Sequence, residues 1–111
     1  MIDINVSEQK NVTLVEAGGR IDSMNANELG EALTELIDQS HLRLVLDLSS
    51  VAYMSSAGLR EIVAALKRVK RAGGDLRIAQ PSERVREVLE MAGLDTIFHI
   101  YQTRVEAVGS Y

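Results

Sequence analysis

The sequence predicts an α/β fold: a small mixed β-sheet of about five strands with helices packed against it. Three observations lead to this fold class. Apolar and polar residues alternate near the N-terminus, which is typical of a half-buried strand. Residues 42–48 are almost continuously apolar, as in a strand covered on both faces of a sheet. Strand-like and helix-like segments then alternate through the second half, which favours βαβ units with parallel strands.

The chain opens with a predicted β-hairpin. Residues 2–7 alternate between apolar and polar side chains, and residues 12–15 are predicted to form the partner strand after a turn at residues 9–11. Gly18 and Gly19 are expected to end this second strand. The hairpin would supply the antiparallel part of the sheet.

A first helix follows the hairpin. Asn25 is predicted to cap it, and Glu28 lies three positions later, which is the spacing of a capping box. Apolar residues recur at helical spacing as far as Ile37, so one stripe should face the core. The polar residues 39–41 end the helix, and the apolar strand at residues 42–48 comes next.

A second helix is predicted to begin at Ser55 or Ser56 and to end at Gly73. Basic residues crowd its last turns, where cations interact favourably with the negative end of the helix dipole. Its apolar face is predicted to consist of Leu59, Ile62, Val63, Leu66 and Val69.

The remaining elements are shorter. A strand is expected around Ile78, and a third helix from Ser82 to Gly93. Residues 97–101 are predicted to form the last strand. A short terminal helix should begin at Thr103, because a glutamate lies three positions later in a second capping box.

Length and composition bound the possible functions. A chain of 111 residues with 46% hydrophobic and 25% charged residues predicts a single domain spanning residues 1–111. The net charge of −4 argues against nucleic-acid binding. Because the chain contains no cysteine, and His41 and His99 are its two histidines, we expect neither a metal site nor a cofactor.

The expected location is the cytoplasm. No apolar run approaches the ~20 residues that a membrane span requires. The first residues lack the basic segment and apolar core of a signal peptide. We therefore expect no membrane partner.

Ser55 and Ser56 are the candidate functional residues. Backbone N–H groups in the first turn of a helix lack helical partners, so a serine there can cap the helix, and the same place suits a phosphate group. No charged residue occurs at residues 48–59, and such neutral surroundings resemble a contact surface for a partner protein. Two interpretations stay open: serines that only cap, or a modified serine that controls binding.

The sequence argues against an enzyme. In the nucleophile elbow of serine hydrolases, a glycine precedes the serine by two positions. With Ser56 as the nucleophile that position holds Met54, and only Gly58 fits the pattern. The two candidate bases, His41 and His99, fall in a predicted loop and a predicted strand.

Residues 44–59, LVLDLSSVAYMSSAGL, resemble the signature of the STAS domain family, and in particular its anti-sigma factor antagonists. Residues 19–22, 73–76 and 85–94 are similar to the family's segment before its first helix and to its later strand and helix. The resemblance covers essentially the whole chain, in order. It implies a STAS-like fold.

The resemblance also implies partner switching. Antagonists of this family bind an anti-sigma factor that is also a serine protein kinase, which frees the sigma factor. The kinase phosphorylates a serine at the start of the second helix, the antagonist dissociates, and a serine phosphatase resets it. The implied phosphoacceptor here is Ser56. The implied partner-binding residues are Asp22, Ser23, Tyr53, Met54, Ser55, Ser56, Ala57, Gly58 and Leu59.

Two positions differ from the family's usual pattern. Ser55 stands where an aspartate is common, and Ala57 stands where a serine or threonine is common. Ser55 is therefore a rival acceptor. The alternatives are a constitutive STAS scaffold, in which both serines only cap the helix, and a small serine hydrolase that uses Ser56.

Overall fold

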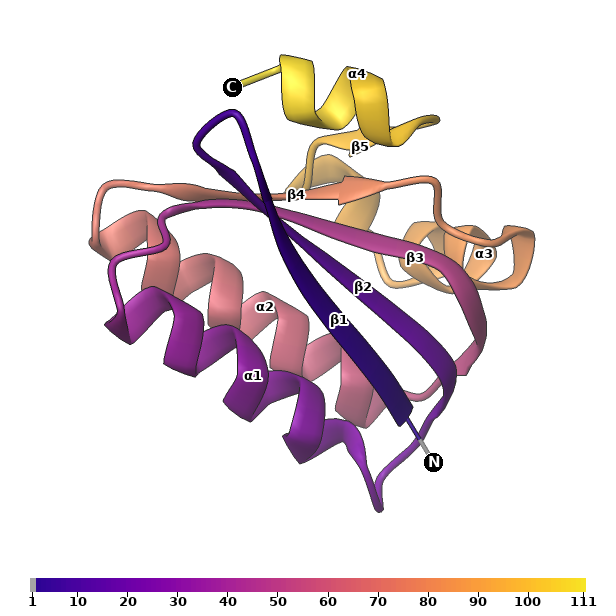
Figure 1. The fold of residues 1–111 in the computed structure, drawn as a ribbon. Helices are drawn as coiled ribbons and strands as arrows, with labels where there is room; N and C mark the ends of the chain where they lie inside the picture. The colour runs from indigo at the N-terminus through magenta and orange to yellow at the C-terminus, as the bar shows by residue number, and fades with distance from the viewer. Residues whose placement is uncertain (1) are drawn as a thin grey trace.

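The computed structural model describes residues 2–111 and confirms the predicted α/β class (Figure 1). Within these residues, five strands form one sheet in the order β1-β2-β3-β4-β5. The strands are β1 (Ile2–Gln9), β2 (Val12–Ile21), β3 (Arg43–Met54), β4 (Asp75–Ala79) and β5 (Ile100–Tyr101). The first two strands pair antiparallel, and the other neighbouring strands pair parallel, so the sheet is mixed as predicted.

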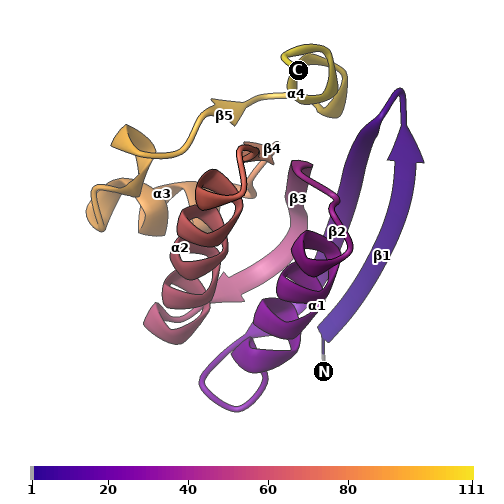
Figure 2. The ribbon, with the colours of Figure 1, turned by 90° about the vertical axis from the view of Figure 1, so that its left-hand side faces the viewer.

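The helices lie on both faces of the sheet. They are α1 (Ala26–Asp38), α2 (Ser56–Arg71), α3 (Glu83–Met91) and α4 (Arg104–Gly109), with a short 3₁₀ turn, η1 (Leu94–Thr96). Figure 2 shows α1 and α2 side by side on one face, α3 on the far side of α2, and α4 on the opposite face. The main core lies under α1 and α2, and a smaller cluster under α4 contains Val12, Leu14, Val45, Ala79 and Ala107.

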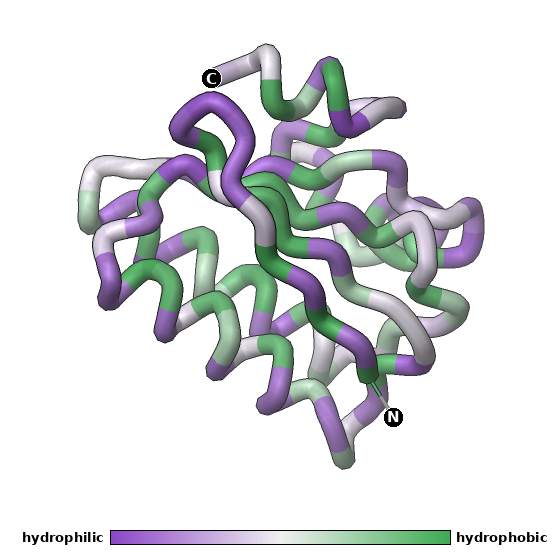
Figure 3. Tube along the Cα trace, in the orientation of Figure 1, coloured by the Kyte–Doolittle hydropathy of each residue, from purple (hydrophilic) through white to green (hydrophobic). Residues whose placement is uncertain are grey.

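Hydrophobic residues mark the interior. Figure 3 shows them gathered along β2 and β3 and on the inward sides of α1 and α2, while the β1–β2 turn is hydrophilic. The predicted apolar face of α2 is confirmed in part, because Ile62, Leu66 and Val69 are buried whereas Leu59 and Val63 are half-buried. This difference leaves part of the α2 surface apolar and accessible.

Three strands are longer than predicted, and the first of them, β1, includes Gln9, which was expected in the turn. Gly18 and Gly19 do not end β2, which continues to Ile21. The strand predicted at residues 42–48 continues to Met54. Much of the charge-free segment before α2 is therefore strand rather than loop.

Bulges in β3 explain the error. Where β2 advances from Glu16 to Gly18, its neighbour β3 advances from Asp47 to Ser50, so β3 holds one extra residue. A second irregularity follows after Gly19. Bulges interrupt the two-residue alternation by which a strand is recognised in a sequence.

Two further predictions are wrong in detail. Asn25 precedes α1 but does not cap it with its side chain. Its Oδ1 accepts a hydrogen bond from the Asp22 N–H (2.9 Å), and its Nδ2 donates to the Arg20 carbonyl (2.8 Å). The last strand is limited to Ile100–Tyr101, because residues 94–96 form η1 and the Phe98 N–H bonds back to that turn. In contrast, the Oγ1 of Thr103 accepts a hydrogen bond from the Glu106 N–H (3.1 Å) and caps α4 as predicted.

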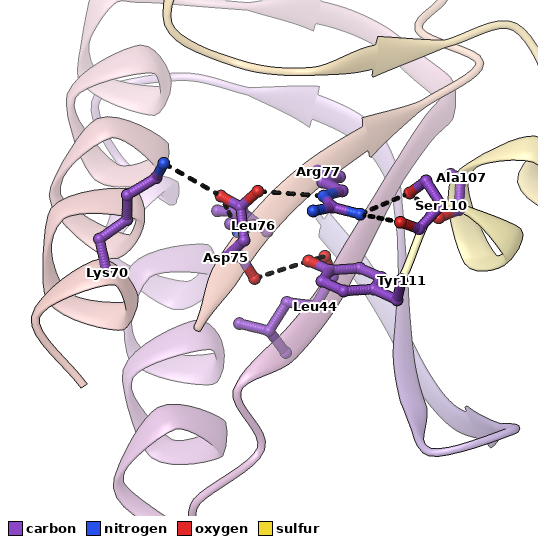
Figure 4. A network of polar contacts seen from close by, with 8 residues as sticks. All are labelled: Leu44, Lys70, Asp75, Leu76, Arg77, Ala107, Ser110 and Tyr111. Atoms are coloured by element: carbon purple, nitrogen blue, oxygen red, sulfur yellow. Dashed lines mark hydrogen bonds and ion pairs between the residues drawn. The ribbon is translucent and has the colours of Figure 1, made fainter. Parts of the chain in front are cut away.

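The C-terminal segment is fixed to the sheet by polar contacts (Figure 4). The Tyr111 hydroxyl lies 2.7 Å from the carbonyl oxygens of both Leu44 and Asp75, and its single O–H proton is shared between these two acceptors. The Arg77 guanidinium stacks 3.9 Å from the centroid of the Tyr111 ring, and its Nη1 donates to the Ser110 carbonyl (2.6 Å). Burial raises the pKa of the Tyr111 hydroxyl well above its usual range.

A buried carboxylate fixes the start of α4. Asp47 in β3 is 2% exposed and accepts a hydrogen bond from the Arg104 Nε. Arg104 also pairs with Glu16 at 2.6 Å, and Gln80 donates to Asp47 at 3.1 Å. The hydrogen bond to Asp47 raises the pKa of the Arg104 guanidinium. These contacts connect α4 to β2, β3 and the end of β4.

Candidate functional site: the start of helix α2

Helix α2 begins beside the end of β2. Ser55 is its N-cap: the backbone is extended (φ −81°, ψ 172°), and Oγ accepts a hydrogen bond from the Gly58 N–H at 3.4 Å. The Ser55 N–H donates to the Ile21 carbonyl at 2.9 Å. The first turn of α2 is therefore attached to the sheet and is capped as the sequence indicated.

Ser56 is the first residue of α2 and differs from its neighbour. Its side chain is exposed. Within residues 2–111 its hydroxyl takes part in no hydrogen bond, whereas the Ser55 hydroxyl caps the helix. No acidic residue lies in the first turn, so the positive end of the helix dipole is not neutralised there. The Ser56 hydroxyl is accessible in a place that favours an added negative charge.

Gly58 and Met54 belong to the core. Met54 is 1% exposed, and a Cβ atom on Gly58 would stand 2.8 Å from the Met54 Cγ. The resemblance implied that both residues contact a partner, which would require open space around them. The structure fills that room with the protein's own side chains, because α2 packs closely on the ends of β2 and β3. Met54 and Gly58 therefore position the site from beneath.

The loop between β2 and α1 lies beside the start of α2, because it follows the Ile21 carbonyl that binds Ser55. Asp22 is half-buried, and its Oδ1 accepts a hydrogen bond from the Met24 N–H at 2.9 Å. Ser23 is exposed, and Met24 is 89% exposed. Asp22 directly follows Ile21, whose carbonyl accepts the Ser55 N–H, so the loop that begins at Asp22 starts next to the N-cap of α2.

Met24 and Arg20 were missed by the sequence analysis. The Arg20 guanidinium lies 4.5 Å from the centroid of the half-buried Tyr53 ring, a cation–π contact. Arg20 and Tyr53 are directly paired across β2 and β3, but the bulges prevent this register from being predicted from the sequence. An exposed methionine has no sequence signal of its own.

A groove of about 520 Å³ runs from the start of α2 along its outer side. We name it the α2–η1 groove. Its lining residues are Ser56, Leu59, Arg60, Val63, Ala64, Lys67, Ala92 and Leu94. Ser56 and Leu59 are thus part of a recessed, largely apolar surface, and half-buried Ala57 lies between them in the chain.

An acidic groove lies on the α1 side of α2. A second groove of about 610 Å³ lies between α1 and α2. Four acidic residues line it: Glu31, Glu35, Asp38 and Glu61. Three of these residues belong to α1 and one, Glu61, belongs to α2, so the acidic charge of this groove comes mainly from α1.

No metal-binding cluster is present in the part of the chain that the structure describes: residues 2–111 contain no group of three or more histidine, cysteine, aspartate or glutamate side chains placed to hold an ion. The Nδ1 of His41 lies 2.9 Å from the Glu8 Oε1 and 3.1 Å from the Thr13 Oγ1, so it bonds to the hairpin and not to Ser56. His99 is exposed. Residues 2–111 also include no helix with the length and apolar character needed to cross a membrane.

Comparisons with known proteins agree with this geometry. The anti-sigma-B factor antagonist of Bacillus subtilis is 36% identical over 100 residues, which cover 89% of this chain and 90% of the relative. The crystal structure of an anti-sigma factor antagonist from Mycobacterium paratuberculosis superimposes with a TM-score of 0.91 at 27% identity, covering 99% of this chain and 93% of that one. The Bacillus cell fate determinant SpoIIAA in the phosphorylated form shares the fold, with a TM-score of 0.75 at 15% identity over 97% of this chain and 98% of SpoIIAA.

A family profile also matches nearly the whole chain. It is described as the STAS domain and matches residues 3–107, which include the sheet, α1 to α3 and most of α4. Because this profile matches nearly the whole chain and the Bacillus subtilis relative is 36% identical to it, this chain belongs to the STAS domain family.

Proposed function

We propose that this protein is an anti-sigma factor antagonist whose binding is switched off by phosphorylation of Ser56. In the unmodified form it binds an anti-sigma factor that is also a serine kinase, and the sigma factor is released. Relatives that this chain covers over about nine-tenths of their length are anti-sigma factor antagonists, and the structure of SpoIIAA includes a phosphorylated form. The observation that carries the switch is the exposed Ser56 hydroxyl, which has no hydrogen-bond partner within residues 2–111.

The modification is a phosphoryl transfer. The kinase moves the γ-phosphoryl group of ATP to the Ser56 Oγ, ADP leaves, and the hydroxyl proton passes to a base of the kinase. A serine phosphatase later hydrolyses the ester with water, which restores the serine and releases inorganic phosphate. Because α2 begins with free N–H groups and a positive dipole end, the added charge of about −1.5 to −2 is tolerated by the fold.

A docked partner does not tolerate that charge. The phosphate must lose its hydration shell at the interface, and a partner surface that fits the neutral serine supplies no group of its own to match it. Mispaired charges at interfaces cost on the order of 2–5 kcal/mol, or about 30- to 5,000-fold in affinity. Phosphorylation then releases the partner although the backbone of the antagonist stays in place.

Ser56 is the better of the two acceptors. The Ser55 Oγ accepts the Gly58 N–H, and a phosphate on Ser55 would replace the hydroxyl that caps the helix. Ser56 has no such role. Ser55 stays as the rival acceptor that the experiment below distinguishes.

The proposed contact surface surrounds this serine. It keeps the accessible residues that the resemblance implied and adds Met24, whose apolar side chain stands out from the loop before α1. The surface consists of Asp22, Ser23, Met24, Tyr53, Ser55, Ser56, Ala57 and Leu59. We further propose that the 111 residues act as a single, non-enzymatic STAS domain in the cytoplasm, where sigma factors are controlled.

The test uses the purified protein and the kinase-type anti-sigma factor of the same organism. Ser56→Ala should bind as the wild type does, and Ser56→Asp should bind at least about 30-fold more weakly in isothermal titration. After incubation with ATP, phosphopeptide mapping should find phosphate on Ser56 in the wild type and in Ser55→Ala, and none in Ser56→Ala.

Other outcomes favour the alternatives. Equal binding of the phosphorylated and unmodified protein would contradict the switch and support a constitutive scaffold. Hydrolysis of a model ester that Ser56→Ala abolishes would support the hydrolase.

A further inference from the structure

The α2–η1 groove extends the serine site along the outer side of α2. Six of its lining residues follow one another at helical spacing over three turns, and two more come from the segment after α3. The six residues of α2 are Ser56, Leu59, Arg60, Val63, Ala64 and Lys67, and the other wall is formed by Ala92 and Leu94. Figure 2 shows the segment after α2 that contains α3 on the side of α2 opposite to α1.

The groove is apolar with a basic margin. Arg60 and Lys67 lie seven positions apart on the same stripe, and no acidic residue lines the groove. Within residues 2–111 neither of them forms an ion pair. In contrast, Arg68 on the α1 side of the same helix pairs with Asp38 at 2.6 Å. A protein of net charge −4 thus carries a groove whose charged margin is entirely positive.

We propose that the α2–η1 groove binds an acidic amphipathic helix of the anti-sigma factor. Its apolar side would pack on Leu59, Val63 and Leu94, and its carboxylates would pair with Arg60 and Lys67. Seven helical residues span about 10 Å, so carboxylates two turns apart on a helix aligned with α2 meet both cations. Charge complementarity selects this occupant, because a basic or purely apolar helix would leave both cations unmatched. This inference rests on the proposed function.

Arg60 connects the groove to the serine. Ser56 and Arg60 are four positions apart on α2, so their side chains are neighbours on one face. A phosphate on Ser56 forms a charge-assisted hydrogen bond with the Arg60 guanidinium more readily than a neutral hydroxyl does. The phosphate and the carboxylate of the partner then compete for Arg60. Phosphorylation thus repels the acidic helix and removes one of the two cations that hold it.

The first experiment reverses the charges of the groove. Arg60→Glu/Lys67→Glu is compared with Lys10→Glu/Arg43→Glu, which changes the net charge equally at exposed residues outside the groove. Both are titrated with the anti-sigma factor in the presence of ADP, and their folding is checked by thermal melting. The groove variant should bind about tenfold more weakly or worse, and the control should stay within about threefold of the wild type. Equal binding of the two variants overturns the groove.

The second experiment measures the competition. Phosphoserine is placed at position 56 in the wild type and in Arg60→Gln, and the loss of affinity caused by the phosphate is compared. The loss should be at least about threefold smaller in Arg60→Gln, since one pairing partner of the phosphate is absent. An equal loss in both backgrounds overturns the role of Arg60.

A phosphorus NMR titration of the phosphorylated protein tests the contact between the phosphate and Arg60 without a partner. The Arg60 guanidinium should lower the second pKa of the phosphate relative to Arg60→Gln, and Arg68→Gln should leave it unchanged. An equal second pKa of the phosphate in the wild type and in Arg60→Gln would contradict this contact. If the unmodified protein fails to bind the anti-sigma factor, the proposed function fails whatever the titration shows. If binding and the phosphate effect are present but the groove variant binds normally, only this inference fails.

Discussion

Gly58 lies so close to Ile21 that a Cβ atom at position 58 would stand 2.9 Å from the Ile21 Cγ2. Real Cβ atoms do not approach a neighbour this closely. The two side chains that such an atom would meet, Ile21 and Met54, are buried in the core. The absence of a side chain at Gly58 therefore sets the distance between α2 and the sheet. The position of the Ser56 hydroxyl depends on that distance.

Gly58→Ala should lower the free energy of unfolding by about 1–3 kcal/mol, because the new methyl group overpacks the contact with Ile21 and Met54. Urea denaturation measures the change. Gly30→Ala in α1 is the control, since its Cβ would meet the movable end of the Glu61 side chain. That variant should be as stable as the wild type or slightly more so, and an equal loss in both variants would contradict the explanation.

Ser55→Ala should destabilise the fold by about 1 kcal/mol, and Ser56→Ala should change it by less than about 0.5 kcal/mol. The physical reason is that the Ser55 Oγ caps α2 and the Ser56 hydroxyl does not. Thermal melting of the two variants side by side gives the answer. A larger loss for Ser56→Ala would show that Ser56, and not Ser55, is the structural serine.

Arg104→Ala should cost about 1–3 kcal/mol. Removing the cation leaves the buried Asp47 carboxylate with Gln80 and the Ser49 N–H as its remaining donors. The cost is below the range for a fully buried pair, because the Arg104 side chain is 40% exposed. Arg68→Ala breaks the exposed pair with Asp38 and should cost at most about 0.5 kcal/mol in the same denaturation assay. Similar losses in the two variants would mean that Asp47 does not depend on its ion pair.

Alkaline pH should lower the free energy of unfolding through Tyr111. The pKa of its hydroxyl is raised in the folded protein, whereas that of an unfolded tyrosine is about 10. Above that pH the unfolded chain loses the proton and the folded chain keeps it, so stability is full below pH 10 and falls as the pH rises further. Tyr111→Phe should remove this part of the pH dependence and cost about 1–2 kcal/mol at neutral pH through the lost hydrogen bonds. Parallel stability curves for the two proteins between pH 7 and about 11 would contradict it.

The sequence predicted what depends on local periodicity and capping. Helix α2, its capped start and the exposed serine follow from a serine pair placed before an apolar stripe. The extended ends of β2 and β3 could not be predicted, because the bulge between Asp47 and Ser50 breaks the alternation of buried and exposed positions. The capping role of Asn25 was wrong for a related reason: its amide bonds to the backbone of Arg20 and Asp22, which is a matter of loop geometry.

The candidate site divides in the same way. Ser55 and Ser56 were identified from residues adjacent in the chain. The α2–η1 groove was not, because Leu94 meets α2 through tertiary packing after a strand and another helix have intervened. The inward direction of Met54 and Gly58 was likewise fixed by how closely α2 approaches β2 and β3. That packing distance cannot be predicted from the identity of the residues alone.

The hydrogen bond between the Ser55 N–H and the Ile21 carbonyl has a consequence for timing. It holds the start of α2 rigidly on the sheet, so a phosphate attached to Ser56 finds a site that needs no rearrangement. Under the proposed switch, the response time would then depend on how fast the kinase and the phosphatase act, and not on a conformational change of this protein.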